Sequence, residues 1–267
     1  MGGSDYSTAV PSGNISLNLS ESEHAMVLGQ GDILLSSGYS YVVATIRRLE
    51  HKNVRIKTIR RGISLSAAVG LYPATQLVIT LPIVKTDQQW TPGEVGLLLR
   101  WKPGYYTKKN TAFFLSSGLI IPKDDSADRG INTNSLLENR ENLHRISFDR
   151  WWQLKNNYIL GTQLLLDIPY AARYKYYERV VQFSIFQRDE RFRTQRLIPS
   201  FQMTYRYDYS LTEENAGWFV FGNANMEVQM TPTMAGNITW GGPLMVGIKG
   251  TQLSQSTLAI GLRWYPQ

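Results

Sequence analysis

Hydrophobic and polar residues alternate with a period of two along most of this chain. The pattern is clearest from Arg60 to Ile83, where apolar residues take every second position on both sides of the turn signal Tyr72-Pro73-Ala74. Strands of soluble β-sandwiches are usually about 5–6 residues long. Strands that cross a bilayer in a barrel need about 9–11 residues, with one apolar and one polar face. The segment therefore predicts two long membrane-spanning strands joined by a tight turn.

Ten further segments alternate in the same way, so the sequence predicts an all-β protein of about twelve strands. Besides the two strands just described, the expected strands begin near Ile33, Val95, Thr111, His144, Leu160, Val181, Leu197, Trp218, Ile238 and Ser256. The segment at His144 carries charges at both parities, which leaves its orientation open. Lipid cannot satisfy the unpaired backbone groups of a sheet edge, so the first and last strands must pair. We predict a transmembrane antiparallel β-barrel over residues 32–267.

Two parts of the chain fall outside this pattern. Residues 1–31 are expected to form a lead-in or plug segment, and Ser20 followed by Glu23 is a capping-box pattern for a short helix over residues 21–28. Residues 1–4 lack the basic and apolar regions of an export signal, so a barrel implies a signal that has been removed. The longest polar interruption, 122–142, is expected to be an extracellular loop, and the even strand count places both barrel termini on the periplasmic side.

Composition narrows the class of protein. Hydrophobic residues make up 43% of the chain, yet no apolar run approaches the 18 residues of a membrane helix, which excludes a helical membrane protein. Aromatic residues make up 12% and gather at the ends of alternating segments, as in the aromatic girdles of barrels. The absence of cysteine excludes disulfides and thiolate metal sites. The net charge of +7 is scattered among strand ends and turns, which disfavours nucleic-acid binding.

Charged residues recur at the polar parity of the predicted strands, and we expect them to line the interior. Two roles are open: Arg–carboxylate pairs that fill the interior, or a charged lining that sets the selectivity of a water-filled route. The predicted lining residues are Arg60, Glu94, Arg100, Asp167, Arg188, Arg206, Asp208, Glu227 and Arg263.

Catalytic and metal-binding residues do not form a convincing set. His144 and Ser147 are three positions apart, so a strand places them on opposite faces. His24 and His51 lie in a terminal segment and a strand connection, and we predict no metal, no cofactor and no enzymatic activity. Two alternatives remain: a barrel hydrolase acting on lipid A or phospholipid, which needs Ser, His and an acid together on the outer face, and a soluble β-rich binding protein.

Several motifs carry a family resemblance. They are Gly70-Leu71-Tyr72-Pro73-Ala74-Thr75-Gln76-Leu77 with Leu81-Pro82-Ile83, the segment Gly93-Glu94-Val95-Gly96, and Gly118-Leu119-Ile120-Ile121-Pro122-Lys123-Asp124-Asp125. These segments resemble the meta-pathway phenol-degradation-like outer-membrane transporters, a family that includes the amyloid-secretion channel FapF. The resemblance implies a pore of roughly twelve strands in the bacterial outer membrane that passes a hydrophobic small molecule or an unfolded polypeptide. Its expected partners are outer-membrane lipid and lipopolysaccharide, the transported substrate and, as a candidate assembly, a homotrimer.

Overall fold

In the computed structural model, the residues described are 28, 30–48, 55–72, 74–86, 89–93, 95–103, 111–121, 143–154, 158–169, 179–189, 196–209, 217–247 and 251–265. The regular elements among them are all strands: β1 (Ile33–Arg48), β2 (Arg55–Tyr72), β3 (Thr75–Thr86), β4 (Gln89–Pro92), β5 (Val95–Trp101), β6 (Thr111–Ile121), β7 (Leu143–Gln153), β8 (Tyr158–Pro169), β9 (Arg179–Asp189), β10 (Leu197–Tyr209), β11 (Gly217–Thr231), β12 (Met234–Gly247) and β13 (Thr251–Trp264). The part of the chain described here holds no helix long and apolar enough to cross a membrane.

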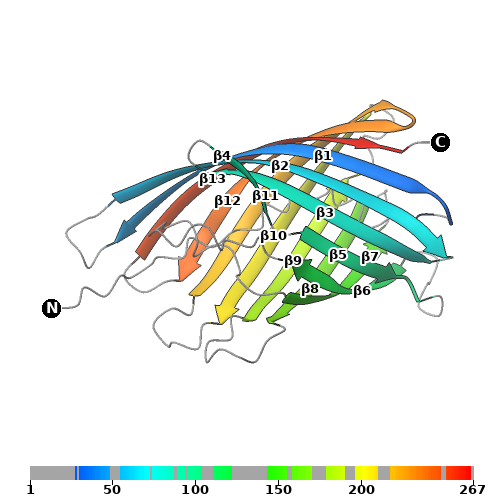
Figure 1. Ribbon diagram of the computed structural model, residues 1–267, viewed down its shortest axis with the longest axis horizontal. Helices are drawn as coiled ribbons and strands as arrows, with labels where there is room; N and C mark the ends of the chain where they lie inside the picture. Colours follow the sequence, from blue (N-terminus) through cyan, green and yellow to red (C-terminus); the bar gives the residue numbers. More distant parts are fainter. Residues whose placement is uncertain are drawn as a thin grey trace.

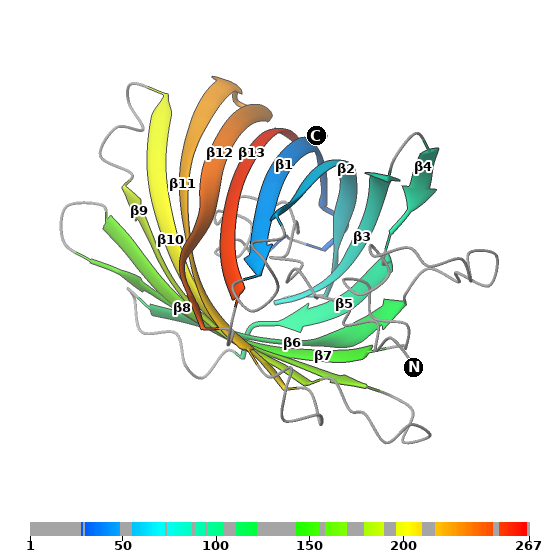
Figure 2. The ribbon, with the colours of Figure 1, turned by 90° about the vertical axis from the view of Figure 1, so that its left-hand side faces the viewer.

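Twelve of these strands form a closed antiparallel ring, which confirms the predicted fold (Figures 1 and 2). Consecutive strands of the ring pair with each other, with β5 following β3. The ring closes because β1 also pairs with β13, from Leu35 opposite Trp264 to Arg48 opposite Thr251. This pairing satisfies the backbone groups that an open sheet would expose to lipid. The expected helix at 21–28 and the long loop at 122–142 lie outside the described residues, except for Leu28, which is not helical.

The strand pairing is divided at one place in the ring, which the sequence pattern did not predict. Opposite β3, the pairing is divided between β4, at Ile83 to Thr86, and β5, at Thr75 to Thr80. Pro82 lies between these two pairings, and its carbonyl accepts a hydrogen bond of 2.7 Å from the Gly93 amide. In an antiparallel strand the N–H and C=O of one residue point to the same neighbour, and proline has no N–H to donate. The break between β4 and β5 therefore falls where β3 lacks a donor.

The two faces of the wall differ as the alternation predicts. Leu65, Leu164 and Leu258 point outward and are 42%, 37% and 45% exposed. The alternate positions, on the inner side, hold buried residues, about half of which are polar or charged. A soluble protein would bury these leucines, since large contiguous apolar surfaces are rare on soluble monomers. The outward apolar surface contradicts the alternative of a soluble binding protein.

The two ends of the barrel also differ. At one end of the barrel β1 begins and β13 ends, and we call it the turn end. The short connections between β2 and β3 (73–74) and between β11 and β12 (232–233) lie there. We call loop end the opposite end, where the chain connects β6 to β7 through 122–142 and β8 to β9 through 170–178. Leu28, just ahead of β1, is buried against Leu34 and Ala68 of the inner wall, so the described chain approaches β1 from inside the turn end.

Candidate functional site

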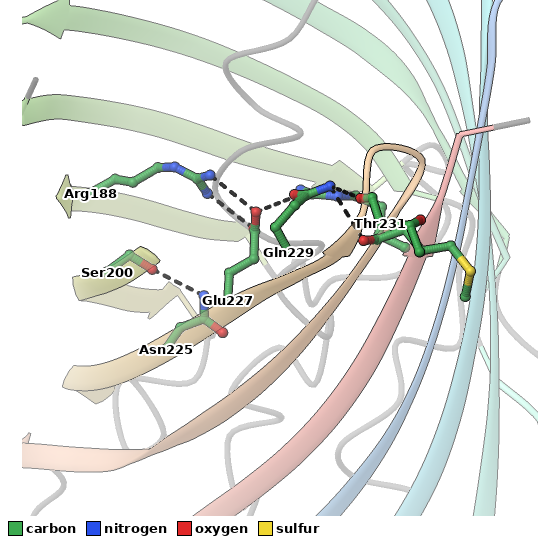
Figure 3. Close-up of polar contacts among 8 residues, drawn as sticks. Arg188, Ser200, Asn225, Glu227, Gln229 and Thr231 are labelled. Carbon is green, nitrogen blue, oxygen red and sulfur yellow. Dashed lines mark hydrogen bonds and ion pairs between the residues drawn. The ribbon is translucent and has the colours of Figure 1, made fainter. Parts of the chain in front are cut away.

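A shared carboxylate joins three strands on the inner wall. Glu227 of β11 accepts two hydrogen bonds of 3.2 Å from Arg188 of β9 and one of 2.6 Å from Arg263 of β13. These strands are not neighbours, so both arginines reach over an intervening strand to meet the carboxylate. Figure 3 shows Arg188 and Glu227 pointing toward each other. All three side chains are less than ten percent exposed. We call these three residues the Glu227 cluster, and it carries two positive charges and one negative charge.

A second charged group lies on β5, β7 and β8. Asp149 accepts a hydrogen bond of 2.8 Å from the Gln163 amide and lies 3.5 Å from an Arg100 guanidinium nitrogen. The Arg100 guanidinium also lies over the Phe114 ring, 4.1 Å from its centroid, where the negative face of the ring attracts it. Arg145 and Asp167, opposite each other on β7 and β8, form a bidentate pair with both distances at 2.7 Å. Arg–carboxylate forks of this kind fix side-chain geometry as well as charge.

Uncharged polar side chains line the wall between the charged groups. The Ser184 and Thr204 hydroxyls are 3.0 Å apart on β9 and β10. Asn225 donates to the Ser200 hydroxyl at 3.1 Å and accepts from the Thr239 hydroxyl at 2.9 Å, which links β10, β11 and β12. Such a polar inner face is typical of barrels that hold water in their interior.

An apolar patch interrupts this polar wall near the turn end. Phe114, Trp151 and Phe186 form a buried cluster, in which the Trp151 and Phe186 ring centroids are 4.3 Å apart. Gly161 lies between them on β8, and a β-carbon there would collide with the Phe186 ring. The Trp151 indole nitrogen is buried and has no hydrogen-bond partner among the described residues. We call these three aromatic residues the inner aromatic cluster.

The predicted lining residues fall into three groups. Arg100, Asp167, Arg188, Arg206, Glu227 and Arg263 are buried, with no more than 8% of their surface exposed. Arg60 and Asp208 occupy inner positions of the register on β2 and β10, opposite Val42 and Gly217, but their side chains are outside the described part of the chain. Glu94 lies outside the described residues altogether.

Asp149, Arg145 and the inner aromatic cluster are inner-wall residues that the sequence pattern did not predict. Asp149 and Arg145 lie on β7, whose orientation was left open because Arg150 adds a charge at the opposite parity. Ser116 of β6 pairs with the inward-facing Arg100 of β5 on one side and with Ser147 of β7 on the other. Paired residues point to the same side of a sheet, so Ser147 and the other odd-numbered residues of β7 face inward. Among the residues whose side chains are described, the inner wall carries five arginines (Arg100, Arg145, Arg188, Arg206 and Arg263) and three carboxylates (Asp149, Asp167 and Glu227). The described side chains of the wall thus leave an excess of two positive charges.

The outer face carries one Ser–His contact. The His144 Nε2 atom lies 2.8 Å from the Ser117 hydroxyl, and both residues are on the lipid-facing side of β6 and β7. Ser147 is buried on the inner face, as its spacing from His144 predicts. The acidic residues in β5 to β8 are Asp149 and Asp167, and both face inward. These strands therefore give the pair no acid on the outer face, which the hydrolase alternative requires. No group of three His, Asp or Glu residues within the described ranges could hold a metal ion.

Comparison with known proteins finds similarity in structure alone. No family model matches the chain, and no curated protein matches its sequence. The crystal structure of the COG4313 outer-membrane channel from Pseudomonas putida F1 is similar with a TM-score of 0.67 and 11% identity, over 90% of this chain and 97% of that one. The NanC porin is similar with a TM-score of 0.56 and 10% identity, over 85% and 100% of the two chains.

The chain has the fold of an outer-membrane β-barrel. The KdgM porin, solved in complex with disordered oligogalacturonate, adds a third structure of this fold, with a TM-score of 0.51 and 5% identity over 86% of this chain and 99% of that one. The closed ring and the apolar outer surface are those of a barrel that spans a membrane, the kind of protein found in the bacterial outer membrane. At such low identity these structures share the fold and leave the solute open.

Proposed function

We propose that this protein is a non-enzymatic outer-membrane channel whose arginine-rich interior passes small solutes and favours anions. The observation that carries the proposal is the charge of the described inner-wall side chains, five arginines against three carboxylates. Charge inside a narrow, low-dielectric wall acts strongly on a passing ion and sets selectivity. The Glu227 cluster contributes to the excess because one carboxylate serves two arginines.

The resemblance to the phenol-degradation-like and FapF family suggests two narrower substrates, a hydrophobic small molecule or an unfolded polypeptide. The inner aromatic cluster favours the first, because it makes part of the inner wall apolar; Phe114, Trp151 and Phe186 are only 1–3% exposed, so a solute would contact them only once neighbouring lining side chains move. Combined with the nearby Arg100, it suits a small anion that carries an apolar part. The homotrimer and the plug role of residues 1–31 stay predictions, the second supported by Leu28 on the inner wall.

Planar-bilayer recording tests the channel directly. Purified protein added to one chamber should give discrete conductance steps, and a tenfold KCl gradient should give a reversal potential of the sign expected for chloride. Protein that has been heat-unfolded before addition is the control, because it lacks the closed ring. Persistent silence across lipid compositions and voltages would reject the channel.

Liposome swelling then compares solutes. An aromatic carboxylate should enter faster than the neutral aromatic alcohol of the same size, and both faster than a peptide of ten residues. Equal rates for the carboxylate and the alcohol would remove the preference for anions and leave the channel itself intact.

A further inference from the structure

The basic residues of β1 to β4 gather at one end of the barrel. These four strands contain no Asp or Glu, and their Lys and Arg residues all lie in the half of the strands toward the loop end. They are Arg47, Arg48, Arg55, Lys57, Arg60, Arg61 and Lys85. The half toward the turn end carries no charge in any of the four strands. Positive charge in these four strands is therefore concentrated at the loop end.

Four of the residues in this region form one continuous row on the outer face. Tyr41 of β1 pairs with Arg61 of β2, Arg61 pairs with Lys85 of β3, and Lys85 pairs with Trp90 of β4. The Arg61 guanidinium lies 5.8 Å from the centroid of the Tyr41 ring, and the Lys85 ammonium lies 5.8 Å from that of Trp90. We call Tyr41, Arg61, Lys85 and Trp90 the outer basic row.

The two cations at the centre of the row face each other without an intervening acid in these strands. Like charges directly opposite each other in a sheet repel, so the arrangement lowers stability unless an anion lies between them. Arg61 and Trp90 are exposed and Lys85 is partly exposed, so the row is open to a ligand from the membrane side. Lys57, also exposed on the same outer face, lies further toward the loop end and extends the positive surface.

The row lies on the lipid-facing side of the wall. Tyrosine and tryptophan on this side favour the headgroup level of a membrane, where their rings are partly in lipid and partly in water. Barrels of the outer membrane place short turns in the periplasm and longer connections outside, so the loop end is extracellular. The outer leaflet there is made of lipopolysaccharide, whose lipid A and core sugars carry phosphate groups.

We propose that the outer basic row is a binding site for the phosphate groups of lipopolysaccharide. Arginine offers a planar fork of donors to phosphate oxygens, and lysine adds a point charge beside it. The flanking Tyr41 and Trp90 rings hold the two cations at headgroup depth and contact the acyl region. The proposal rests on the outer-membrane location of the barrel and is independent of whether the lumen conducts.

A double variant tests the site. Arg61→Gln with Lys85→Gln removes both positive charges and keeps side-chain length and polarity. The matched control is Arg150→Gln, because Arg150 is also an exposed outer-face arginine over an aromatic ring, 4.9 Å from the Trp152 centroid, but lies toward the turn end. Affinity for fluorescent lipopolysaccharide is measured on detergent-purified protein, and the same preparations are tested for heat-modifiable migration to show that each barrel is folded.

The double variant should bind lipopolysaccharide at least tenfold more weakly than the wild type, while the control variant binds as the wild type does. Dephosphorylated lipopolysaccharide should lose most of its affinity for the wild type, and phosphatidylglycerol should compete poorly. If the double variant does not fold, Lys85→Gln alone should weaken binding about fivefold, as the loss of one of the two charges implies. Unchanged affinity in the folded variants would overturn the proposal, and so would equal binding of phosphatidylglycerol, which would indicate a general anion-binding surface.

Discussion

Replacing Glu227 by Gln removes the carboxylate that Arg188 and Arg263 share. The change breaks the two bonds of 3.2 Å and the bond of 2.6 Å and leaves two guanidinium groups facing each other across a buried amide. Removing one partner of a buried ion pair typically costs about 3–5 kcal/mol, because the remaining charge is desolvated without compensation. The glutamine amide oxygen can still accept a hydrogen bond from one guanidinium, so we expect the lower limit, about 3 kcal/mol of unfolding free energy.

Urea unfolding in lipid vesicles, followed by tryptophan fluorescence and by electrophoretic mobility, measures this loss. The double variant Arg188→Gln, Glu227→Gln is the matched comparison, because it removes one positive and one negative charge together. It should recover roughly 1–3 kcal/mol relative to the sum of the two single variants, the usual coupling of contacting charges. A Glu227→Gln protein within about 0.5 kcal/mol of the wild type would refute the inferred role of the cluster.

Glu227→Gln should also change the anion selectivity of the channel, because it changes the charge of the inner wall. The loss of one carboxylate raises the positive excess of the described inner wall, so Glu227→Gln should shift the reversal potential further toward that of chloride. A shift toward potassium would contradict the assignment of Glu227 to the solute route.

Three further predictions use other parts of the wall. Leu258→Arg, at an outer position in the middle of β13, should lower the free energy of unfolding by about 2–4 kcal/mol. Thr257→Arg, at the neighbouring inner position, should lower it much less, and equal losses would contradict the assigned faces. Gly161→Ala should cost about 1–3 kcal/mol because the new methyl group meets the Phe186 ring, and loss of near-ultraviolet circular dichroism from Trp151 should accompany it. Raising KCl from 0.1 to 1 M should weaken anion selectivity, since the screening length falls from about 10 Å to about 3 Å; a preference that does not change with salt would indicate a steric cause.

The alternation of the sequence was sufficient to predict the closed barrel and the orientation of most strands. The period-two pattern of segments such as Arg60 to Ile83 appears in the structure as an outward apolar and an inward polar face because a pleated strand has only two sides. Six charged residues predicted at the polar parity are buried on the inner wall for the same reason.

The sequence did not predict which side chains of different strands contact each other. The sharing of Glu227 by Arg188 and Arg263 depends on contacts across two intervening strands, and the outer basic row depends on the register of four strands. The contact between His144 and Ser117 was equally invisible, since the sequence suggested only the nearby Ser147. The break between β4 and β5 follows from Pro82, whose missing donor matters only once its partner strand is known.

The absence of cysteine makes a direct test of the two faces practical. Thr257→Cys and Leu258→Cys place single thiols on adjacent inner and outer positions of β13. In proteoliposomes and planar bilayers, a charged, membrane-impermeant thiol reagent should modify Cys at 257 and reduce the conductance. Cys at 258 should react only with a lipid-soluble reagent and leave the conductance unchanged. The opposite pattern, or modification of both thiols by the charged reagent, would contradict a barrel with an apolar exterior and a water-filled, conducting interior.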